Sequence, residues 1–128
     1  MHNQPSLEEI HIKEITQQQL EAYGLVSNDY NPIHFDLKAA QDAGFPRQIA
    51  HGMFTMGVST NLVAPWLSTH LVKSYETSFI QPLLVGDSLR IKGTATTTDQ
   101  TTSIVFTGEN QHGETIIKGQ ISLEVHAR

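Results

Sequence analysis

The segment from Gly52 to Val63 is apolar around nearly its whole circumference, and this constrains the fold more than any other feature. Helical geometry spreads its large side chains over every face: Met53, Phe54, Met56, Val58, Leu62 and Val63. A helix that is apolar on all sides is typical of a buried helix, which other elements must cover. Gly57 in its middle costs about 1 kcal/mol relative to Ala, which predicts tight packing against its backbone. Pro65 limits the extent of the helix.

Four runs rich in Thr, Ile, Val and Phe follow, and turn residues separate them. They predict long β-strands at 71–80, 88–98, 101–110 and 115–125. A single buried helix needs a sheet around it, so we expect an α+β fold in which a curved antiparallel sheet encloses 52–63. The chain of 128 residues has the usual size of one domain, spanning residues 1–128. Its exposed edge strands would be protected by pairing two copies, which predicts a homodimer.

The first half of the chain predicts three short elements. Residues 10–12 alternate apolar and polar side chains, as a half-buried strand does. Thr16 and Gln19 form a capping-box pattern, so a helix should begin there and end before Ser27. Asp36 is suited to cap a second helix over 37–43, with Gly44 as its stop.

Composition excludes several functions. The chain has no cysteine, which removes disulfides and thiolate chemistry, and none of its seven histidines stands in a tight metal-ligand spacing. We therefore expect no metal; a site built from His34, Asp36 and His51 has no supporting spacing. The net charge of −5 disfavours nucleic acid. Without an N-terminal signal-peptide pattern or a membrane-length apolar run, we expect a soluble, cytoplasmic protein that does not bind membranes.

The segment from Ser27 to His34 carries the chemistry. Asp29 and His34 stand five residues apart, which suits neither one helix face nor one strand face. Asn31 and Pro32 between them favour a turn, which can bring both side chains to one small volume. An acid and a near-neutral base at one point can move protons or activate water. The alternative is a surface turn in which Asp29 caps the backbone and His34 is solvated.

Three segments together resemble the MaoC-like dehydratases and (R)-specific enoyl-CoA hydratases. Residues 29–34 look like the D-x-N-P-x-H motif of that family, and residues 50–53 resemble the start of its central helix. Five further residues match its F-x-x-P-x-x-x-G-D-x-L signature: Phe79, Pro82, Gly86, Asp87 and Leu89. The resemblance covers about residues 10–125 and implies the hot-dog fold, in agreement with a sheet wrapped around a helix.

The resemblance also implies an activity, the reversible hydration of a trans-2-enoyl thioester to the (R)-3-hydroxyacyl thioester. The substrate would be an acyl-CoA or an acyl carrier protein thioester, with no cofactor. Asp29 and His34 would bind the catalytic water and exchange proton-transfer roles. The backbone N–H of Gly52, at the positive end of a helix, would polarise the thioester carbonyl. Packing where the helix meets the sheet is the alternative explanation for Gly52.

Other residues receive weaker assignments. Candidate substrate-binding residues are Asn31, Met53, Ser59 and Thr60; Asn31 could instead order the loop. Thr60 stands where the family often has a serine. His51 is expected to be structural, and Arg47 could meet a carrier phosphate or simply be solvated. Asn28 departs from the glycine that the family usually has before its aspartate.

Two rival functions remain open. A hot-dog thioesterase often uses a carboxylate on or near the central helix, yet no Asp or Glu lies between Asp42 and Glu76. A non-catalytic acyl-binding subunit would have little need of Asp29 together with His34. Both observations favour the hydratase.

Overall fold

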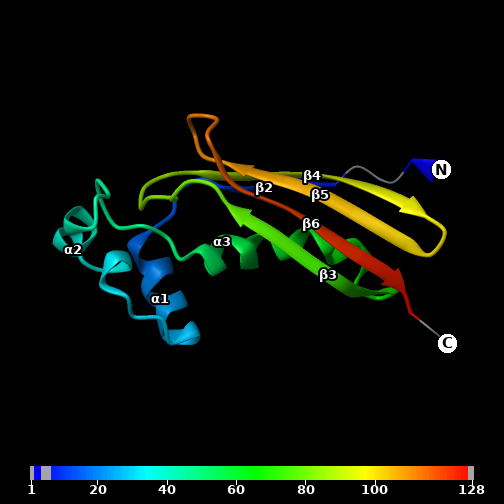
Figure 1. The fold of residues 1–128 in the computed structure, drawn as a ribbon, viewed down its shortest axis with the longest axis horizontal. Coiled ribbons are helices and arrows are strands. Elements are labelled where there is room, and N and C mark those ends of the chain that lie inside the picture. Colours follow the sequence, from blue (N-terminus) through cyan, green and yellow to red (C-terminus); the bar gives the residue numbers. More distant parts are fainter. Residues whose placement is uncertain (1, 4–6, 127–128) are drawn as a thin grey trace.

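The computed structural model describes residues 2–3 and 7–126, and places one antiparallel sheet over a set of helices (Figure 1). The strands are β1 (His2–Asn3), β2 (Ile10–Ile12), β3 (His70–Phe79), β4 (Leu89–Thr98), β5 (Thr101–Glu109) and β6 (Thr115–Val125). The α-helices are α1 (Gln17–Ser27), α2 (Leu37–Asp42) and α3 (Gly52–Ser59). Two 3-10 helices complete the list, η1 (Pro32–His34) and η2 (Thr60–Trp66).

The sheet follows the order β1-β4-β5-β6-β3, with β2 also paired to β4. The four long strands begin and end within one residue of their predicted bounds, since local alternation and turn signals set them. Strand β3 forms an edge and pairs with β6, from His70 opposite Val125 to Phe79 opposite Ile117. The predicted α+β class with a sheet over a central helix is confirmed.

The helices begin where the sequence predicts, because their caps are local. Thr16 Oγ1 accepts the N–H of Gln19, and the Gln19 side chain accepts the N–H of Thr16, so the capping box is complete. Asp36 accepts the N–H of Ala39 at 2.9 Å and begins α2. Gly44 follows with φ of 98°, a conformation that glycine adopts without steric cost.

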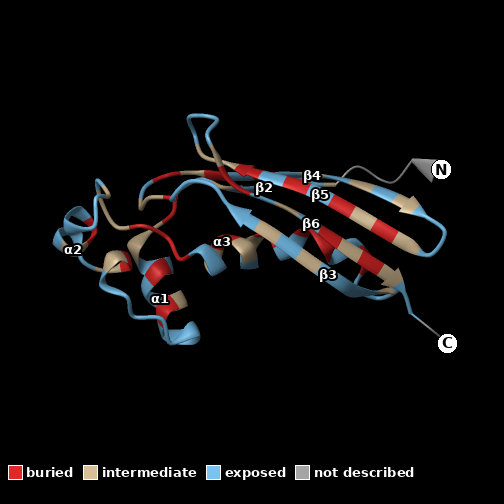
Figure 2. Ribbon diagram, viewed as in Figure 1, coloured by how far each residue is buried: buried red, intermediate tan, exposed pale blue. Residues whose placement is uncertain are grey.

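The hydrophobic core lies between the sheet and the helix layer (Figure 2). Alternate residues of β5 point into it, including Ile104 and Phe106, as expected for a sheet covered on one face. Trp66 and Leu62 of η2 pack against the same cluster, while Leu20 joins from α1. This arrangement fixes the N-terminal end of α3 beside the loops that carry Asp29 and His34.

The expectation of a helix buried on all sides is wrong for the single chain. Only Thr55 and Ser59 of α3 are buried, and Met53 is 57% exposed. A Cβ built on Gly57 meets nothing within 4 Å, so nothing among the described residues packs on that backbone. An apolar pattern does not specify which face of a helix other elements cover, and the described residues leave the face with Met53 exposed. Pro65 does not end the segment; the chain continues through it as the 3-10 helix η2.

The sequence did not predict β1, η1 or the 3-10 form of η2. Of the helices in the described ranges, none is both long and apolar enough to cross a bilayer.

Candidate active site

The loop that carries Asp29 is shaped by the end of α1. Asn28 caps the helix in the left-handed conformation, with φ of 60°, and the N–H groups of Asn28 and Asp29 both donate to the Gly24 carbonyl. Asparagine tolerates this conformation better than most residues. Asn28 thus adopts a conformation that glycine, the residue the family usually has here, takes without steric cost.

Two side chains then order the backbone towards His34. Asp29 Oδ1 accepts the N–H of Asn31 at 3.2 Å, and Asn31 Oδ1 accepts the N–H of Ile33 at 3.2 Å. Asn31 thereby caps η1, as asparagine commonly does at turns. The ordering role considered for Asn31 is observed; its contact with substrate stays a prediction.

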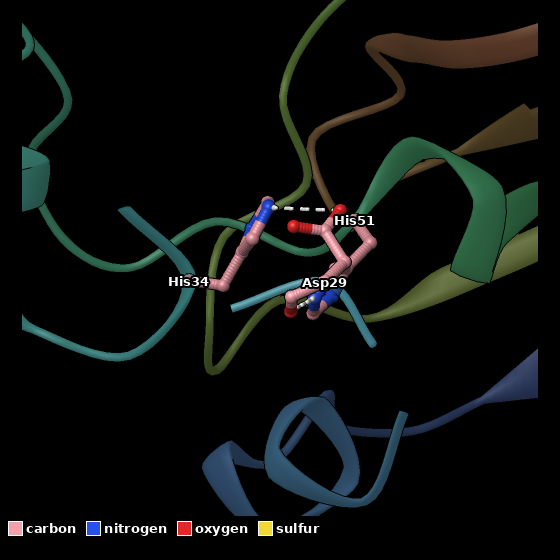
Figure 3. A group of neighbouring side chains, drawn as sticks. All are labelled: Asp29, His34 and His51. Carbon is pink, nitrogen blue, oxygen red and sulfur yellow. Dashed lines mark hydrogen bonds and ion pairs between the residues drawn. The ribbon is translucent and has the colours of Figure 1, made fainter. Parts of the chain in front are cut away.

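Asp29 and His34 come together as the spacing predicts (Figure 3). Oδ2 of Asp29 lies 4.0 Å from Nε2 of His34, and the side chains are 50% and 8% exposed respectively. His34 Nδ1 lies 2.8 Å from the Ile49 carbonyl, which can only accept, so Nδ1 carries a proton. Nε2 is thus the nitrogen that is free to exchange protons on the side of Asp29. The alternative of a solvated His34 is wrong.

His51 completes the cluster from the N-cap position of α3. Its ring stacks on that of His34, with centroids 3.7 Å apart and planes inclined by 21°. Its Nε2 lies 3.2 Å from the Asp29 carbonyl oxygen and therefore donates to it. Its Nδ1 is buried and has no hydrogen-bond partner in the described part of the chain.

Burial lowers the pKa of His51 below its usual 6.5, and the nearby His34 lowers it further. The hydrogen bond to the Asp29 carbonyl and the Asp29 charge act in the opposite direction without overcoming burial. A neutral imidazole is the result, with its proton on Nε2 and a lone pair on Nδ1.

Asp29, His34 and His51 offer ligand atoms within 4.8 Å of one another, so a metal ion has to be considered. Histidine binds metals through the in-plane lone pair, at about 2.0–2.1 Å for zinc. The two rings are nearly parallel and stacked, so their in-plane lone pairs do not converge on one point. Moreover, His51 Nε2 is already engaged by a carbonyl. The stacked geometry fits proton transfer better than metal ligation.

Gly52 begins α3, and its N–H meets no acceptor within the described ranges. A Cβ at this position would lie 3.3 Å from the Phe79 ring, so glycine permits the strand β3 side chain to approach the helix end. Gly52 lines a pocket of about 350 Å³ that is mostly apolar. His51, Thr55, Phe79 and Ile116 also line it, as do Phe45, Ile49, Ala50 and residues 80–83.

The pocket adjoins the Asp29–His34 pair through Ile49 and His51, although neither Asp29 nor His34 lines it. The unsatisfied Gly52 donor, the apolar pocket and the acid–base pair thus occupy one end of α3. Such an arrangement can hold an acyl group, polarise its carbonyl and exchange protons beside it.

The remaining predicted substrate contacts lie elsewhere on α3. Ser59 is fully buried and bonds to the Met56 carbonyl and to the Tyr75 hydroxyl. Burial raises the pKa of Tyr75, against the opposing effect of that Ser59 bond. Thr60 donates to the Gly57 carbonyl at 2.6 Å, and Met53 is exposed. None of the three lines the Gly52 pocket, and their contact with substrate stays a prediction.

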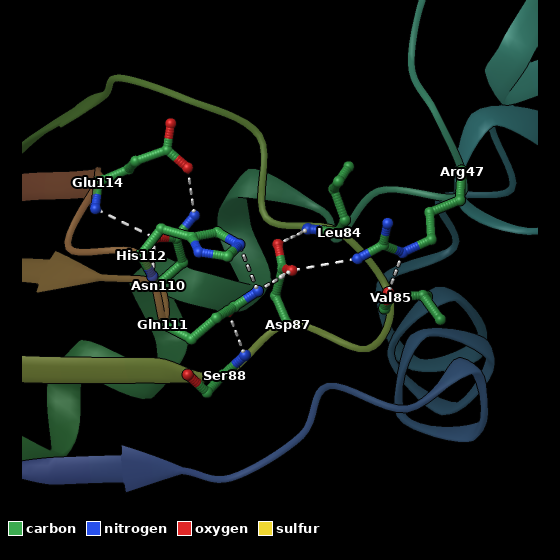
Figure 4. A network of polar contacts seen from close by, with 9 residues as sticks. All are labelled: Arg47, Leu84, Val85, Asp87, Ser88, Asn110, Gln111, His112 and Glu114. Carbon is green, nitrogen blue, oxygen red and sulfur yellow. Dashed lines mark hydrogen bonds and ion pairs between the residues drawn. The ribbon is translucent and has the colours of Figure 1, made fainter.

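Arg47 belongs to a polar network that fixes the loops around the site (Figure 4). Its Nη2 lies 3.2 Å from Oδ1 of Asp87, and its Nε donates to the Val85 carbonyl. Asp87 is only 3% exposed and also accepts the N–H of Leu84 and the side-chain amide of Gln111. Arg47 is therefore held by protein groups rather than free in solvent, and a carrier phosphate would have to share it.

The sequence pointed to Asp29, His34 and Gly52, which the structure brings to one end of α3, and it gave no site role to His51 or Phe79. The only local signal for His51 was its place directly before Gly52. The stacking on His34 depends on tertiary structure, because 17 residues separate the two in the chain. Phe79 was recognised as part of a motif, without a role beside Gly52.

Comparison with known proteins identifies the family of this site. The family described as MaoC like domain matches residues 2–120. A mitochondrial 3-hydroxyacyl-[acyl-carrier-protein] dehydratase of Arabidopsis thaliana is 30% identical over 74 residues, which is 58% of this chain and 45% of that protein. The 3-hydroxyacyl-thioester dehydratase X of Mycobacterium tuberculosis is 39% identical over 72 residues, 56% of this chain and 25% of that protein. The matched segments thus span less than half of these relatives.

Solved structures show the same fold. An (R)-hydratase from A. caviae involved in PHA biosynthesis has a TM-score of 0.82 at 22% identity, and the match covers 96% of this chain and 98% of that one. A structure described as a MaoC-like dehydratase gives 0.83 at 26% identity, over 98% of this chain and 41% of the other. The hot-dog fold of these hydratases is therefore the fold found here. Because the family match runs through both the Asp29–His34 loop and the Gly52 helix, the chain belongs to the MaoC-like dehydratase family.

Proposed function

We propose that this protein is a hydratase and dehydratase of acyl thioesters. It would add water reversibly to trans-2-enoyl-CoA, or to the corresponding acyl carrier protein thioester, and form the (R)-3-hydroxyacyl product. The observation that carries the proposal is the Asp29–His34 pair, with Oδ2 4.0 Å from Nε2, beside the unsatisfied Gly52 N–H. The homology to dehydratases of hydroxyacyl thioesters supports the same reaction class.

The separation of the pair suits a bridging water. Two atoms 4.0 Å apart are too far for a direct hydrogen bond, yet one water can lie about 2.8 Å from each. In hydration, Asp29 accepts a proton from this water as its oxygen bonds to C3 of the substrate. His34, when both of its ring nitrogens carry a proton, delivers the proton on Nε2 to C2 and is left neutral with its proton on Nδ1. Asp29 is left protonated, and dehydration reverses both transfers. The bond from Nδ1 to Ile49 supports Nε2 as the exchanging atom.

The thioester carbonyl gains negative charge in this reaction and needs a hydrogen-bond donor. The Gly52 N–H is such a donor, placed where the helix dipole adds positive potential. Loss of one donor of this kind typically costs about 10²- to 10³-fold in rate. The mostly apolar pocket beside Gly52 supports binding of the acyl portion.

The test is the loss of enoyl-thioester absorbance when the purified protein meets crotonyl-CoA and longer enoyl-CoAs. We expect turnover by the wild type, and a fall of about 10²-fold or more in kcat for Asp29→Asn and for His34→Ala. Matched controls are Asp99→Asn, at an exposed turn position with φ of 54° that asparagine also tolerates, and His11→Ala, at the exposed position of β2. Both should keep wild-type rates.

Three results would contradict the proposal. Equal hydration by wild type and Asp29→Asn would remove the catalytic pair. Release of free thiol from a saturated acyl-CoA, without hydration, would establish the thioesterase alternative. Tight acyl-CoA binding without turnover of either substrate would indicate an acyl-binding subunit.

We also propose that the protein forms a homodimer through β3. This strand is a ten-residue edge, and it and the residue after it expose Leu71, Val72, Phe79 and Ile80, each 47–56% accessible. Long apolar edges favour pairing with a further strand. Light scattering after size exclusion should give twice the monomer mass, and Val72→Lys should shift it towards the monomer. A wild-type monomer at micromolar concentration would refute this proposal.

A further inference from the structure

We propose that His51 is a positioning residue that holds the Asp29–His34 pair in register with the Gly52 N–H. The inference rests on the proposed hydratase function and goes beyond it, because neither proton transfer nor carbonyl binding requires a second histidine. His51 is 2% exposed, and its two ring contacts reach both members of the pair. Its place in the chain, directly before Gly52, links them to the helix end.

The first link is to Asp29. The Asp29 carboxylate projects from a loop and is half exposed, so its position depends on how the loop backbone is held. The N–H of His51 Nε2 donates to the Asp29 carbonyl at 3.2 Å and ties that backbone to α3. The Gly24 carbonyl holds the same residue through its N–H. Asp29 is therefore fastened on both sides of its Cα, to α1 and to α3.

The second link is to His34. The His51 ring covers one face of the His34 ring at a centroid distance of 3.7 Å, and Phe35 approaches both rings edge-on. The Ile49 carbonyl fixes His34 Nδ1 from the side, so that stacking and hydrogen bonding together leave the ring one orientation. Nε2 then faces Asp29 Oδ2. Misplacement of a reacting group by about 1 Å can cost about 10²-fold in rate.

The link to Asp29 requires a proton on Nε2 of His51, and the stack on His34 favours the neutral ring, which carries that proton alone. A proton on Nδ1 would add positive charge against the face of His34, which must itself gain and lose a proton. The titratable groups facing His51 from the packed elements are Asp29, His34 and Tyr23, whose ring lies 5.0 Å away, edge-on. Burial supports the neutral form by lowering the pKa of His51.

The test compares two substitutions of equal chemistry but different reach. The amide nitrogen of His51→Gln can occupy the position of Nε2 and donate to Asp29, whereas that of His51→Asn is one methylene shorter. We expect kcat to fall less than about tenfold in His51→Gln and about 100-fold in His51→Asn. KM should stay within about threefold of wild type in both variants. Three results would overturn the proposal: an equal loss of kcat in His51→Gln and His51→Asn, a wild-type kcat in His51→Asn, or an effect on KM alone.

A measurement that does not depend on turnover separates this inference from the proposed function. NMR of isotope-labelled histidines should show His51 neutral and protonated on Nε2 at neutral pH, and neutral His34 protonated on Nδ1. A cationic His51, or one protonated on Nδ1, would overturn the positioning role whether or not the enzyme is active. If the NMR result holds but the wild type turns over no enoyl thioester, the hydratase proposal fails and the geometric role of His51 stands.

Discussion

The Phe35 ring lies so close to the backbone of Gly24 that a Cβ on Gly24 would be 2.5 Å from its Cζ atom. The same Cβ would lie 3.0 Å from the Asp29 carbonyl oxygen, the atom that accepts from His51. A side chain at Gly24 has no room, because α1 approaches both the Phe35 ring beside the histidines and the loop that carries the Asp29 carboxylate. This glycine lies inside a helix, where it costs helix stability relative to alanine.

We predict that Gly24→Ala lowers both stability and activity, although alanine is the better helix former. The methyl group must displace Phe35 or the Asp29 carbonyl, and overpacking of this kind typically costs about 1–3 kcal/mol. Urea unfolding measures the stability, and enoyl-CoA turnover measures the activity. Gly57→Ala is the matched control, since its Cβ meets nothing within 4 Å, and it should keep or raise the stability of the monomeric chain. A more stable Gly24→Ala with full activity would contradict the prediction.

The network around Asp87 yields a second prediction. Asp87 joins the loop before α3 to the β5–β6 hairpin through Arg47 and Gln111, and it accepts the Leu84 N–H at 2.9 Å. Removal of its buried carboxylate in Asp87→Ala should cost about 3–5 kcal/mol, because the donors lose their partner. Arg47→Lys should cost less, since the side chain of Arg47 is 41% exposed. A lower urea midpoint for Arg47→Lys than for Asp87→Ala would refute this prediction.

Asn28 provides a third prediction. Its φ of 60° suits asparagine and glycine, whereas a β-branched residue is strained there. Asn28→Gly should therefore change stability by less than about 1 kcal/mol and preserve turnover, while Asn28→Val should be destabilised by about 1–2 kcal/mol. Thermal unfolding and the hydratase assay report the two effects. Equal stability and turnover of Asn28→Gly and Asn28→Val would show that the turn does not depend on the left-handed conformation.

The sequence predicts best what local chemistry decides. Thr16 with Gln19, and Asp36 with Ala39, fix the starts of α1 and α2 within a few residues, and the long strands follow from alternation between turns. The meeting of Asp29 and His34 was predictable for the same reason, because one short turn produces it. Here local preference and the final fold agree.

The remainder depends on contacts between distant segments. His51 reaches Asp29 from 22 residues away, and Arg47 reaches Asp87 from 40, so no local pattern marks either contact. The apolar circumference of residues 52–63 gave no indication that Met53 would lie on an exposed face. Hydrophobicity alone does not distinguish burial within a chain from burial between chains.

The lowered pKa of His51 predicts how stability changes with pH. Above its unfolded pKa of about 6.5, His51 is neutral in both states, and its contribution to stability is fully present. As the pH falls towards the lower pKa of His51 in the folded chain, His51 binds a proton in the unfolded chain but not yet in the folded chain. The free energy of unfolding must then decrease with decreasing pH.

We expect His51→Gln to remove this dependence. Urea unfolding between roughly pH 7.5 and pH 5 should show a steeper loss of stability in the wild type than in His51→Gln, so that the two curves converge at low pH. His11→Gln, at an exposed strand position, should retain the wild-type slope. Parallel curves for wild type and His51→Gln would mean that His51 titrates alike in the folded and unfolded chains. Because wild type and His51→Gln share every other titratable group, the difference between their slopes isolates His51.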